Sequence, residues 1–221
     1  MNAFPDAIEF QRGVVKPVEC LKAGHELVRS QYWLFVGIAA VGMLIAGVVP
    51  LGILMGPMMC GVYFSLFKQR RGQRVEFGDL FKGFDYFGES LIAALLHIVP
   101  MFVLLIPTYI IFYISMFAMM AAGGGREPDP GIVLGFFGFW AIIWIVLIVV
   151  LILLSVLFTF AYPLIVDRRL SGFDAVKLSM KAARANFGGL LGLVFLSALL
   201  SFVGVLFCYV GAFLVMPITF G

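Results

Sequence analysis

The sequence predicts an all-α integral membrane protein, a single transmembrane domain over residues 1–221 with about six transmembrane helices arranged as three repeats. The first observation behind this fold class is composition: 63% of the residues are hydrophobic, 12% are charged, and the mean hydropathy is +1.11. A soluble domain carries about 25% charged residues. The second observation is that the charges cluster, and the third is a helical pattern that recurs in three segments. Together they predict a helical bundle whose surface faces lipid.

Four stretches of the chain contain no Asp, Glu, Lys or Arg and are rich in Gly and Phe, which makes them candidates for membrane spans. They cover residues 33–67, 90–125, 130–166 and 185–221. A helix needs about 20 apolar residues to cross ~30 Å of hydrocarbon. The fourth span is longer than one crossing and the sixth is short, so five or seven spans remain alternatives. We place the six spans at about 33–49, 51–67, 90–120, 131–166, 187–205 and 207–221.

The basic residues indicate how the chain is oriented in the membrane. All but one of the 15 Lys and Arg residues lie in the N-terminal segment, in 68–89 or in 167–186, and six spans place these segments on one side. Only Arg126, in the loop at 121–130, falls on the opposite side. Because basic loops are retained in the cytoplasm, we expect both termini of this multi-pass protein to be cytoplasmic.

Each of the three basic segments contains side chains that recur at spacings of three, four, three and four residues, which follow one face of a helix. The three series are Phe77, Leu80, Phe84, Phe87 and Leu91; Phe173, Val176, Met180, Ala183 and Phe187; and Val18, Leu21, His25, Val28 and Tyr32. His25 is the one poor fit. Each series ends where an uncharged stretch begins, so each predicts an amphipathic interfacial helix that leads into the membrane.

Further matches favour a true repeat over a chance likeness between amphipathic helices. Gly37 of the first copy corresponds to Gly192 of the third, and Pro57-x-x-x-Gly61 corresponds to Pro217-x-x-x-Gly221. Self-similarity of this kind is the signature of a repeat architecture. We therefore expect three units, each an amphipathic helix followed by a transmembrane hairpin, at about 16–68, 75–167 and 172–221.

The segment 68–87, KQRRGQRVEFGDLFKGFDYF, combines basic residues with regularly placed Phe and Leu. In an interfacial helix the apolar side chains enter the acyl boundary while Lys and Arg meet anionic headgroups. A role in topology alone is the main alternative, and nucleic-acid binding is weaker because basic runs beside a span are ordinarily topology signals. The candidate headgroup-binding residues are Lys68, Arg70, Arg71, Arg74, Lys82, Arg168, Arg169, Lys177, Lys181 and Arg184.

The third span contains the residues that would form a transport path, if the protein has one. His97 is the only ionisable residue well inside a span, and Pro100 and Pro107 follow it, with Tyr109 beyond. Transporter helices are broken at their binding sites, so a break at these prolines is one interpretation, and a simple kink is the alternative and the commoner outcome. A structural role for His97 is the favoured interpretation, because Pro100 removes a backbone donor next to it and a polar side chain satisfies the groups freed at such a break.

No catalytic constellation is present in the sequence. It contains no GxSxG, P-loop or GxGxxG motif, and HELVR at 25–29 has Arg29 where a metalloprotease has its second metal ligand. We therefore expect no catalytic residues, no metal site and no cofactor.

The last third of the chain carries a set of local features at Pro163, Asp167-Arg168, Ala175–Ser179 and Asn186-Phe187. This set, within 162–200, resembles a recurring segment of uncharacterised bacterial multi-span inner-membrane proteins. These are similar to the membrane domain attached to some glycerophosphoryl diester phosphodiesterases. The resemblance extends more loosely over 50–90 and implies a bacterial inner-membrane location. It implies no activity, because the phosphodiesterase domain itself is absent.

The function that the sequence favours is a non-enzymatic membrane scaffold or accessory subunit that engages anionic lipid headgroups at the cytoplasmic face. Membrane lipids are its expected partners, with other integral membrane proteins or self-association as further ones, and no nucleic acid. The alternative is a small-molecule or lipid transporter whose path runs beside the third span. An integral-membrane lipid enzyme is the weakest hypothesis.

Overall fold

The computed structural model describes residues 13–48, 52–122, 128–206 and 210–220, and every regular element in them is a helix. Arg12, Arg126 and Gly221, which the predictions of orientation and repeat used, lie outside these residues. The chain divides into two compact units. We call Met1–Leu95 with Val156–Gly221 the charged unit, and Leu96–Ser155 the hairpin unit. Each is described by itself.

The charged unit holds most of the helices, and local sequence explains where several of them begin. Pro17 occupies the first turn of its helix, where a missing N–H costs nothing. The Ser171 hydroxyl accepts the N–H of Asp174 at 3.2 Å and so caps the helix that follows. The elements are α1 (Pro17–Val28), η1 (Arg29–Gln31), α2 (Tyr32–Val48), α3 (Met55–Arg70), η3 (Phe77–Tyr86), the start of α4 (Phe87–Ala122), the end of α5 (Pro130–Phe158), α6 (Ala161–Arg168), α7 (Gly172–Ala185), α8 (Phe187–Leu206) and α9 (Val210–Phe220).

One core cluster of the charged unit joins α1, α2, α3 and η3. Phe35, Ile38, Met58 and Leu80 are buried within it, each exposed by 2% or less. Leu80 comes from η3, a short 3₁₀ segment that the sequence predicts as an amphipathic helix. This core therefore attaches the second basic segment, which contains η3, to α2 and α3.

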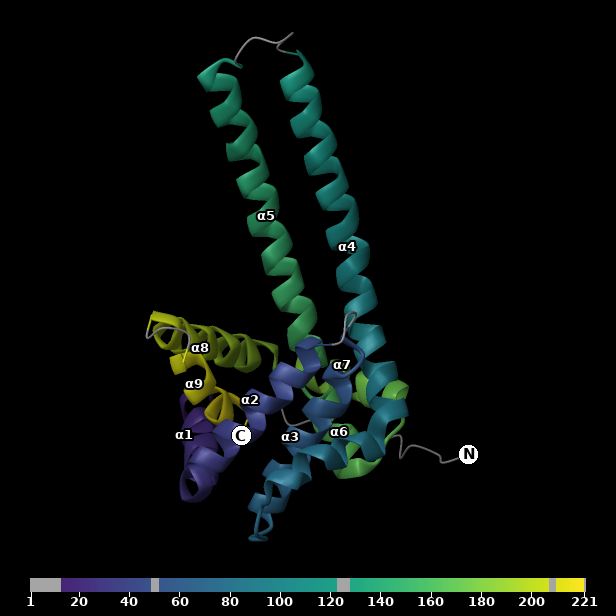
Figure 1. The fold of residues 1–221 in the computed structure, drawn as a ribbon, viewed down its shortest axis with the longest axis vertical. Helices are drawn as coiled ribbons and strands as arrows, with labels where there is room; N and C mark the ends of the chain where they lie inside the picture. Colours follow the sequence, from purple (N-terminus) through teal and green to yellow (C-terminus); the bar gives the residue numbers. More distant parts are fainter. Residues whose placement is uncertain (1–12, 49–51, 123–127, 207–209, 221) are drawn as a thin grey trace. The chain divides into compact units, whose positions relative to one another are not determined.

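The hairpin unit consists of the rest of α4 and α5, which run antiparallel beside each other (Figure 1). Aromatic rings make the contacts between them. The ring of Phe112 meets that of Trp140 edge-on at 5.1 Å between centroids, and Tyr109 meets Trp144 in the same way at 4.7 Å. Such edge-to-face pairs are favourable beyond the area that they bury.

Three helical stretches in the described residues are long and apolar enough to cross a membrane: Pro17–Val48, Phe77–Ala122 and Pro130–Arg168. A fourth crossing is counted if α7 and α8, which meet at a bend of 95°, form one broken span. The chain is thus an all-helical protein with the helices of a membrane protein. The second and sixth predicted spans correspond to α3 and α9, of 16 and 11 residues. A count of six spans and the repeat remain predictions.

The third span is not broken at its two prolines. The helix α4 continues from Phe87 to Ala122 with both Pro100 and Pro107 inside it. A proline removes one backbone hydrogen bond, and the chain before and after it stays helical here. The hypothesis of a broken transport helix loses its structural basis.

Candidate functional site

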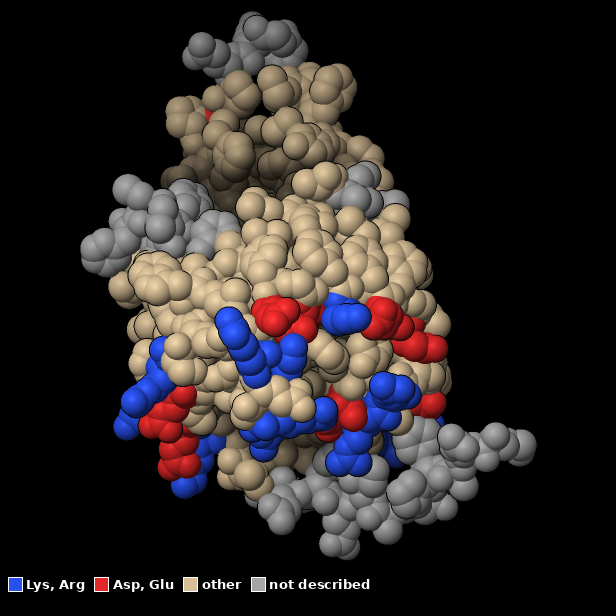
Figure 2. Space-filling model, turned by 60° about the horizontal axis from the view of Figure 1, so that its bottom comes forward, with Lys and Arg blue, Asp and Glu red and all other residues tan. Residues whose placement is uncertain are grey.

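The predicted headgroup-binding residues all belong to the charged unit. Figure 2 shows that Lys, Arg, Asp and Glu side chains gather in one region of the surface seen in that view. The cations come from the end of α3 and its following loop, from η3, from the end of α6 and from α7. All of them are exposed except Lys68, which is half-buried. We call this surface the charged face.

Lys68 has a structural partner that the sequence analysis did not foresee. Its Nζ lies 3.0 Å from Oδ1 and 2.8 Å from Oδ2 of Asp79. The same carboxylate accepts the backbone N–H of Glu76 at 2.8 Å, and Glu76 in return caps the start of η3. Lys68 therefore fixes η3 to α3, and the exposed cations around it are the ones available to a ligand.

The close approach of η3 to α3 depends on two glycines. A Cβ atom on Gly61 would overlap the carbonyl oxygen of Leu80, and one on Gly83 would overlap the carbonyl oxygen of Pro57. Only glycine allows two backbones to approach this closely. The motif Pro57-x-x-x-Gly61 therefore allows η3, in the second basic segment, to pack closely against α3.

The other side of η3, together with the first residue of α4, is a row of exposed phenylalanines. Phe77, Phe81, Phe84 and Phe87 are exposed by 41%, 46%, 40% and 38%. The predicted face placed Leu80 in this row, and it is instead fully buried against α3, while Phe81 takes part in the row. The contact at Gly61 and Gly83 rotates the Leu80 side inward, which the spacing of apolar residues alone does not reveal.

The first members of the other two predicted series are exposed as well. Phe173 at the start of α7 is 62% exposed, and Val18 at the start of α1 is 56% exposed. Six residues after the first member of each series stands a small buried residue, namely Gly24, Gly83 and Ser179. This shared position was not used in the sequence analysis, although it could have been found there.

Ser179 also hydrogen-bonds the backbone groups that are left without helical partners between α5 and α6. Its hydroxyl donates to the carbonyl oxygen of Leu157 at 2.7 Å and accepts the N–H of Phe160 at 3.1 Å. Backbone groups freed at a helix break need such partners in an apolar environment. α7 is therefore held against this break through a side chain.

Two further side chains bind the backbone at the entrance of helices distant in sequence. Glu89 Oε2 accepts the N–H of Gly172, the first residue of α7, at 2.6 Å. The side-chain oxygen of Asn186 accepts the N–H of Val14, just before α1, at 3.1 Å. A carboxylate is favourable at a helix N-terminus because the helix dipole is positive there.

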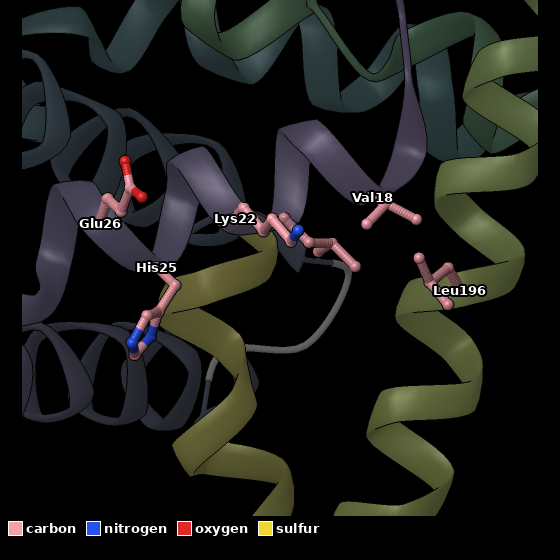
Figure 3. A pocket seen from close by; sticks show the side chains of 6 residues that line it. Val18, Lys22, His25, Glu26 and Leu196 are labelled. Carbon is pink, nitrogen blue, oxygen red and sulfur yellow. The ribbon is translucent and has the colours of Figure 1, made fainter.

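Among the described residues of the charged unit, two pockets have linings that bear on function. The larger, of about 580 Å³, is lined by Asp85, Tyr86, Gly88, Glu89, Ile165, Arg169 and Leu170. The smaller, of about 300 Å³, lies between α1 and α8; Figure 3 shows Val18 and Leu196 facing each other across it. Its remaining lining residues are Leu21, Lys22, His25 and Glu26. The smaller pocket is mainly apolar, whereas the larger one contains charges of both signs.

The residues of the predicted transport path are not brought together with either pocket. His97, Pro100, Pro107 and Tyr109 all lie on the part of α4 that belongs to the hairpin unit. Tyr109 packs its ring against Trp144. No group of three metal-binding side chains occurs among the residues that the structure describes.

Comparison with known proteins gives no match, either to a family model, to a curated protein or to a solved structure. The relation of residues 162–200 to bacterial inner-membrane proteins therefore stays a prediction. What this chain does has to be inferred from its own geometry, above all from the charged face.

Proposed function

We propose that the protein is a non-enzymatic integral membrane scaffold or accessory subunit whose charged face engages anionic lipid headgroups at the cytoplasmic membrane surface. The observation that carries the proposal is η3, which presents a row of exposed phenylalanines beside exposed cations. An interfacial element needs both features, apolar side chains for the acyl boundary and basic ones for the headgroups. A soluble surface would gain nothing from four adjacent exposed phenyl rings.

The energies of the two features are comparable. Burying a phenyl ring that is exposed in water stabilises by about 1.5–3 kcal/mol. Each Lys or Arg near an anionic leaflet contributes about 1 kcal/mol. In the sequence, Arg70, Arg71 and Arg74 precede the phenylalanine row and Lys82 lies within it. All four are exposed, so both energy terms act on the same short segment.

The attachment of η3 to α3 suits a scaffold. The glycine contact at Gly61 and Gly83 and the ion pair of Lys68 with Asp79 hold the segment in one orientation. Since a held segment loses little conformational freedom when it meets a lipid or a partner, less of the interaction energy is spent on ordering. The surface is preorganised for contact.

The repeat interpretation and the orientation are part of this proposal. Three units at 16–68, 75–167 and 172–221 are supported by the small buried residues at matching positions, Gly24, Gly83 and Ser179. The basic segments of these units favour the cytoplasmic side for the charged face and both termini. A bacterial inner membrane with partners inside it is the setting that we infer.

The test is the preference of the purified protein for anionic lipid, measured by the association of spin-labelled phosphatidylglycerol and phosphatidylcholine with the protein in bilayers. Substituting Arg70, Arg71 and Arg74 together by Gln should reduce the preference for phosphatidylglycerol by about fivefold for each charge. The matched control substitutes the same residues by Lys, which keeps the charge and should keep the preference. Equal association of both lipids with the unmodified protein would reject the proposal.

The scaffold part of the proposal has a separate test. Extraction in native-lipid particles, followed by mass spectrometry, should identify a stoichiometric protein partner or a second copy. Transport remains the alternative, but no contact or cavity described above favours it. A particle that contains one small molecule and no partner protein would favour transport over the scaffold.

A further inference from the structure

We propose that the larger pocket binds the phosphoethanolamine headgroup of an aminophospholipid. The pocket holds about 580 Å³ and is lined from two directions, by the junction of η3 with α4 and by the end of α6 with its following loop. Sites for small ligands have volumes of about 300–1,000 Å³. The pocket shares Arg169 with the charged face, while its other lining residues are not among the predicted headgroup-binding cations. The inference therefore does not depend on Arg70, Arg71 and Arg74 binding anionic lipid.

One wall of the pocket carries two carboxylates four residues apart in sequence, Asp85 and Glu89. Like charges at this spacing repel one another on a helical segment. Glu89 is held in place by its bond from the N–H of Gly172 at 2.6 Å, at the positive end of α7. Among the residues described, Asp85 takes part in no ion pair. A cation placed between the two carboxylates would relieve the repulsion.

The segment after α6 contributes Arg169 to the same pocket, and this residue has a left-handed backbone with a φ of 51°. The nearest acid in sequence is already engaged, since Asp167 lies 3.5 Å from Arg71 and 3.6 Å from Arg168. Arg169 itself has no ion-pair partner within the described part of the chain. Its guanidinium is therefore available for an anion, and its fork of N–H donors matches a phosphate.

Opposite charges in one pocket match a ligand that is itself a zwitterion. Phosphoethanolamine carries a phosphate anion and a primary ammonium, and an ammonium has three N–H donors for the carboxylates. The quaternary ammonium of phosphatidylcholine has no N–H, and phosphatidylglycerol has no cation, so each leaves Asp85 and Glu89 unsatisfied. The geometry thus favours ethanolamine over choline and glycerol headgroups.

The surroundings of the pocket favour a lipid over a free headgroup. Ile165, Leu170 and the ring of Tyr86 add apolar lining. Phe84 and Phe87, which are neighbours of the lining residues in sequence, stack on each other at 6.5 Å and are exposed. An acyl chain leaving the pocket has an apolar surface to follow, whereas soluble phosphoethanolamine does not use it.

The test is a titration of the detergent-solubilised, full-length protein with short-chain phosphatidylethanolamine, phosphatidylcholine and phosphatidylglycerol, and with soluble phosphoethanolamine, followed by native mass spectrometry. Phosphatidylethanolamine should bind at least about tenfold more tightly than the other two lipids and than the soluble headgroup, since a lost charge-assisted hydrogen bond costs about a factor of ten or more. Asp85→Asn and Arg169→Gln should each remove about tenfold of that affinity.

Two controls separate loss of the site from loss of the fold. Arg169→Gly removes the guanidinium but suits the left-handed backbone, so it should lower the affinity without lowering the melting temperature. Glu19→Gln neutralises a carboxylate that is 68% exposed and lies outside the pocket, and it should change nothing. Equal affinity for the three lipids, or full binding by the Asp85 and Arg169 variants, would overturn the site. Soluble phosphoethanolamine binding as tightly as the lipid would overturn the lipid as its source.

Discussion

The charged unit and the hairpin unit are held together in different ways. In the charged unit, η3 reaches backbone contact with α3 through Gly61 and Gly83. In the hairpin unit, α4 and α5 are kept apart by aromatic rings such as those of Phe112 and Trp140. Over Pro130–Ser155, the described part of α5 in this unit, Trp140 and Leu147 are its two buried residues. One unit encloses a core, and the other leaves most of its side chains to its surroundings.

This difference shows which helices of the chain depend on particular contacts for their packing. In lipid there is no hydrophobic force to bring two apolar helices together, so association depends on close packing and on polar contacts. The charged unit has both, in its glycines and in bonds such as that of Lys68 with Asp79. The hairpin unit has bulky side chains that lipid solvates as well as another helix does. Substitutions should therefore lower the free energy of unfolding more in the charged unit than in the hairpin unit.

The largest effect is expected from Gly61→Ala. The added methyl group would overlap the backbone of Leu80, so η3 has to move away from α3, at a cost of about 3 kcal/mol in the free energy of unfolding. The measurement is an unfolding titration in mixed micelles followed by far-ultraviolet circular dichroism. Gly78→Ala is the matched control, because nothing lies within 4 Å of its Cβ position. Equal stability of the two variants would show that η3 is not packed as described.

The second largest effect is expected from Asp79→Asn, which should lower the free energy of unfolding by about 2 kcal/mol. The carboxylate is only 11% exposed, and it holds Lys68 as well as the N–H of Glu76. The same unfolding titration measures the loss. Glu19→Gln breaks an ion pair whose side chains are 65% and 68% exposed, and such a pair contributes little. If both variants lose the same stability, burial is not what makes the Asp79 pair important.

Ser179→Ala should cost about 1 kcal/mol, because the carbonyl oxygen of Leu157 and the N–H of Phe160 lose their partner. The comparison is Ser115→Ala in the hairpin unit, where the hydroxyl bonds only to the carbonyl of Phe112 within its own helix. Hydrogen exchange measured at Phe160 should rise in the first variant alone. Unchanged exchange there would mean that Ser179 does not secure the helix break.

The smallest effect is expected in the hairpin unit itself. Trp144→Leu removes the edge-to-face contact with Tyr109 at 4.7 Å, and the loss beyond lipid solvation should be about 0.5 kcal/mol. Ile145→Leu is its neighbour and control, since Ile145 is 62% exposed. A loss above that of Asp79→Asn would reverse the contrast between the units and identify α4 and α5 as the more specific pair.

The helix positions were predictable because charge marks their ends. The first, third and fifth spans were expected to begin near residues 33, 90 and 187, and α2, α4 and α8 begin at Tyr32, Phe87 and Phe187. Where uncharged stretches meet basic segments, the local sequence is sufficient. The presence of cations on one face was also expected, and Arg70, Arg71 and Arg74 are indeed exposed.

What could not be predicted depends on contacts between distant segments. The ion pair of Lys68, the burial of Leu80 and the helix break capped by Ser179 each involve a partner that no periodicity identifies. The large pocket is the clearest case, because Glu89 and Arg169 come from segments far apart in the chain. The prolines left two interpretations open, a break and a kink, and the structure excludes the break because α4 continues through Pro100 and Pro107.

The bond between Val14 and Asn186 sets a timing problem for the growing chain, because 172 residues separate its two ends. At a synthesis rate of about 5–20 residues per second, roughly ten to thirty seconds pass between the synthesis of Val14, the donor, and that of Asn186, its acceptor. α8 packs beside α1 through the same region, at Gly189 against Val15. The contact at the start of α1 therefore forms only after α7 has been synthesised, and membrane insertion has to keep α1 accessible until then.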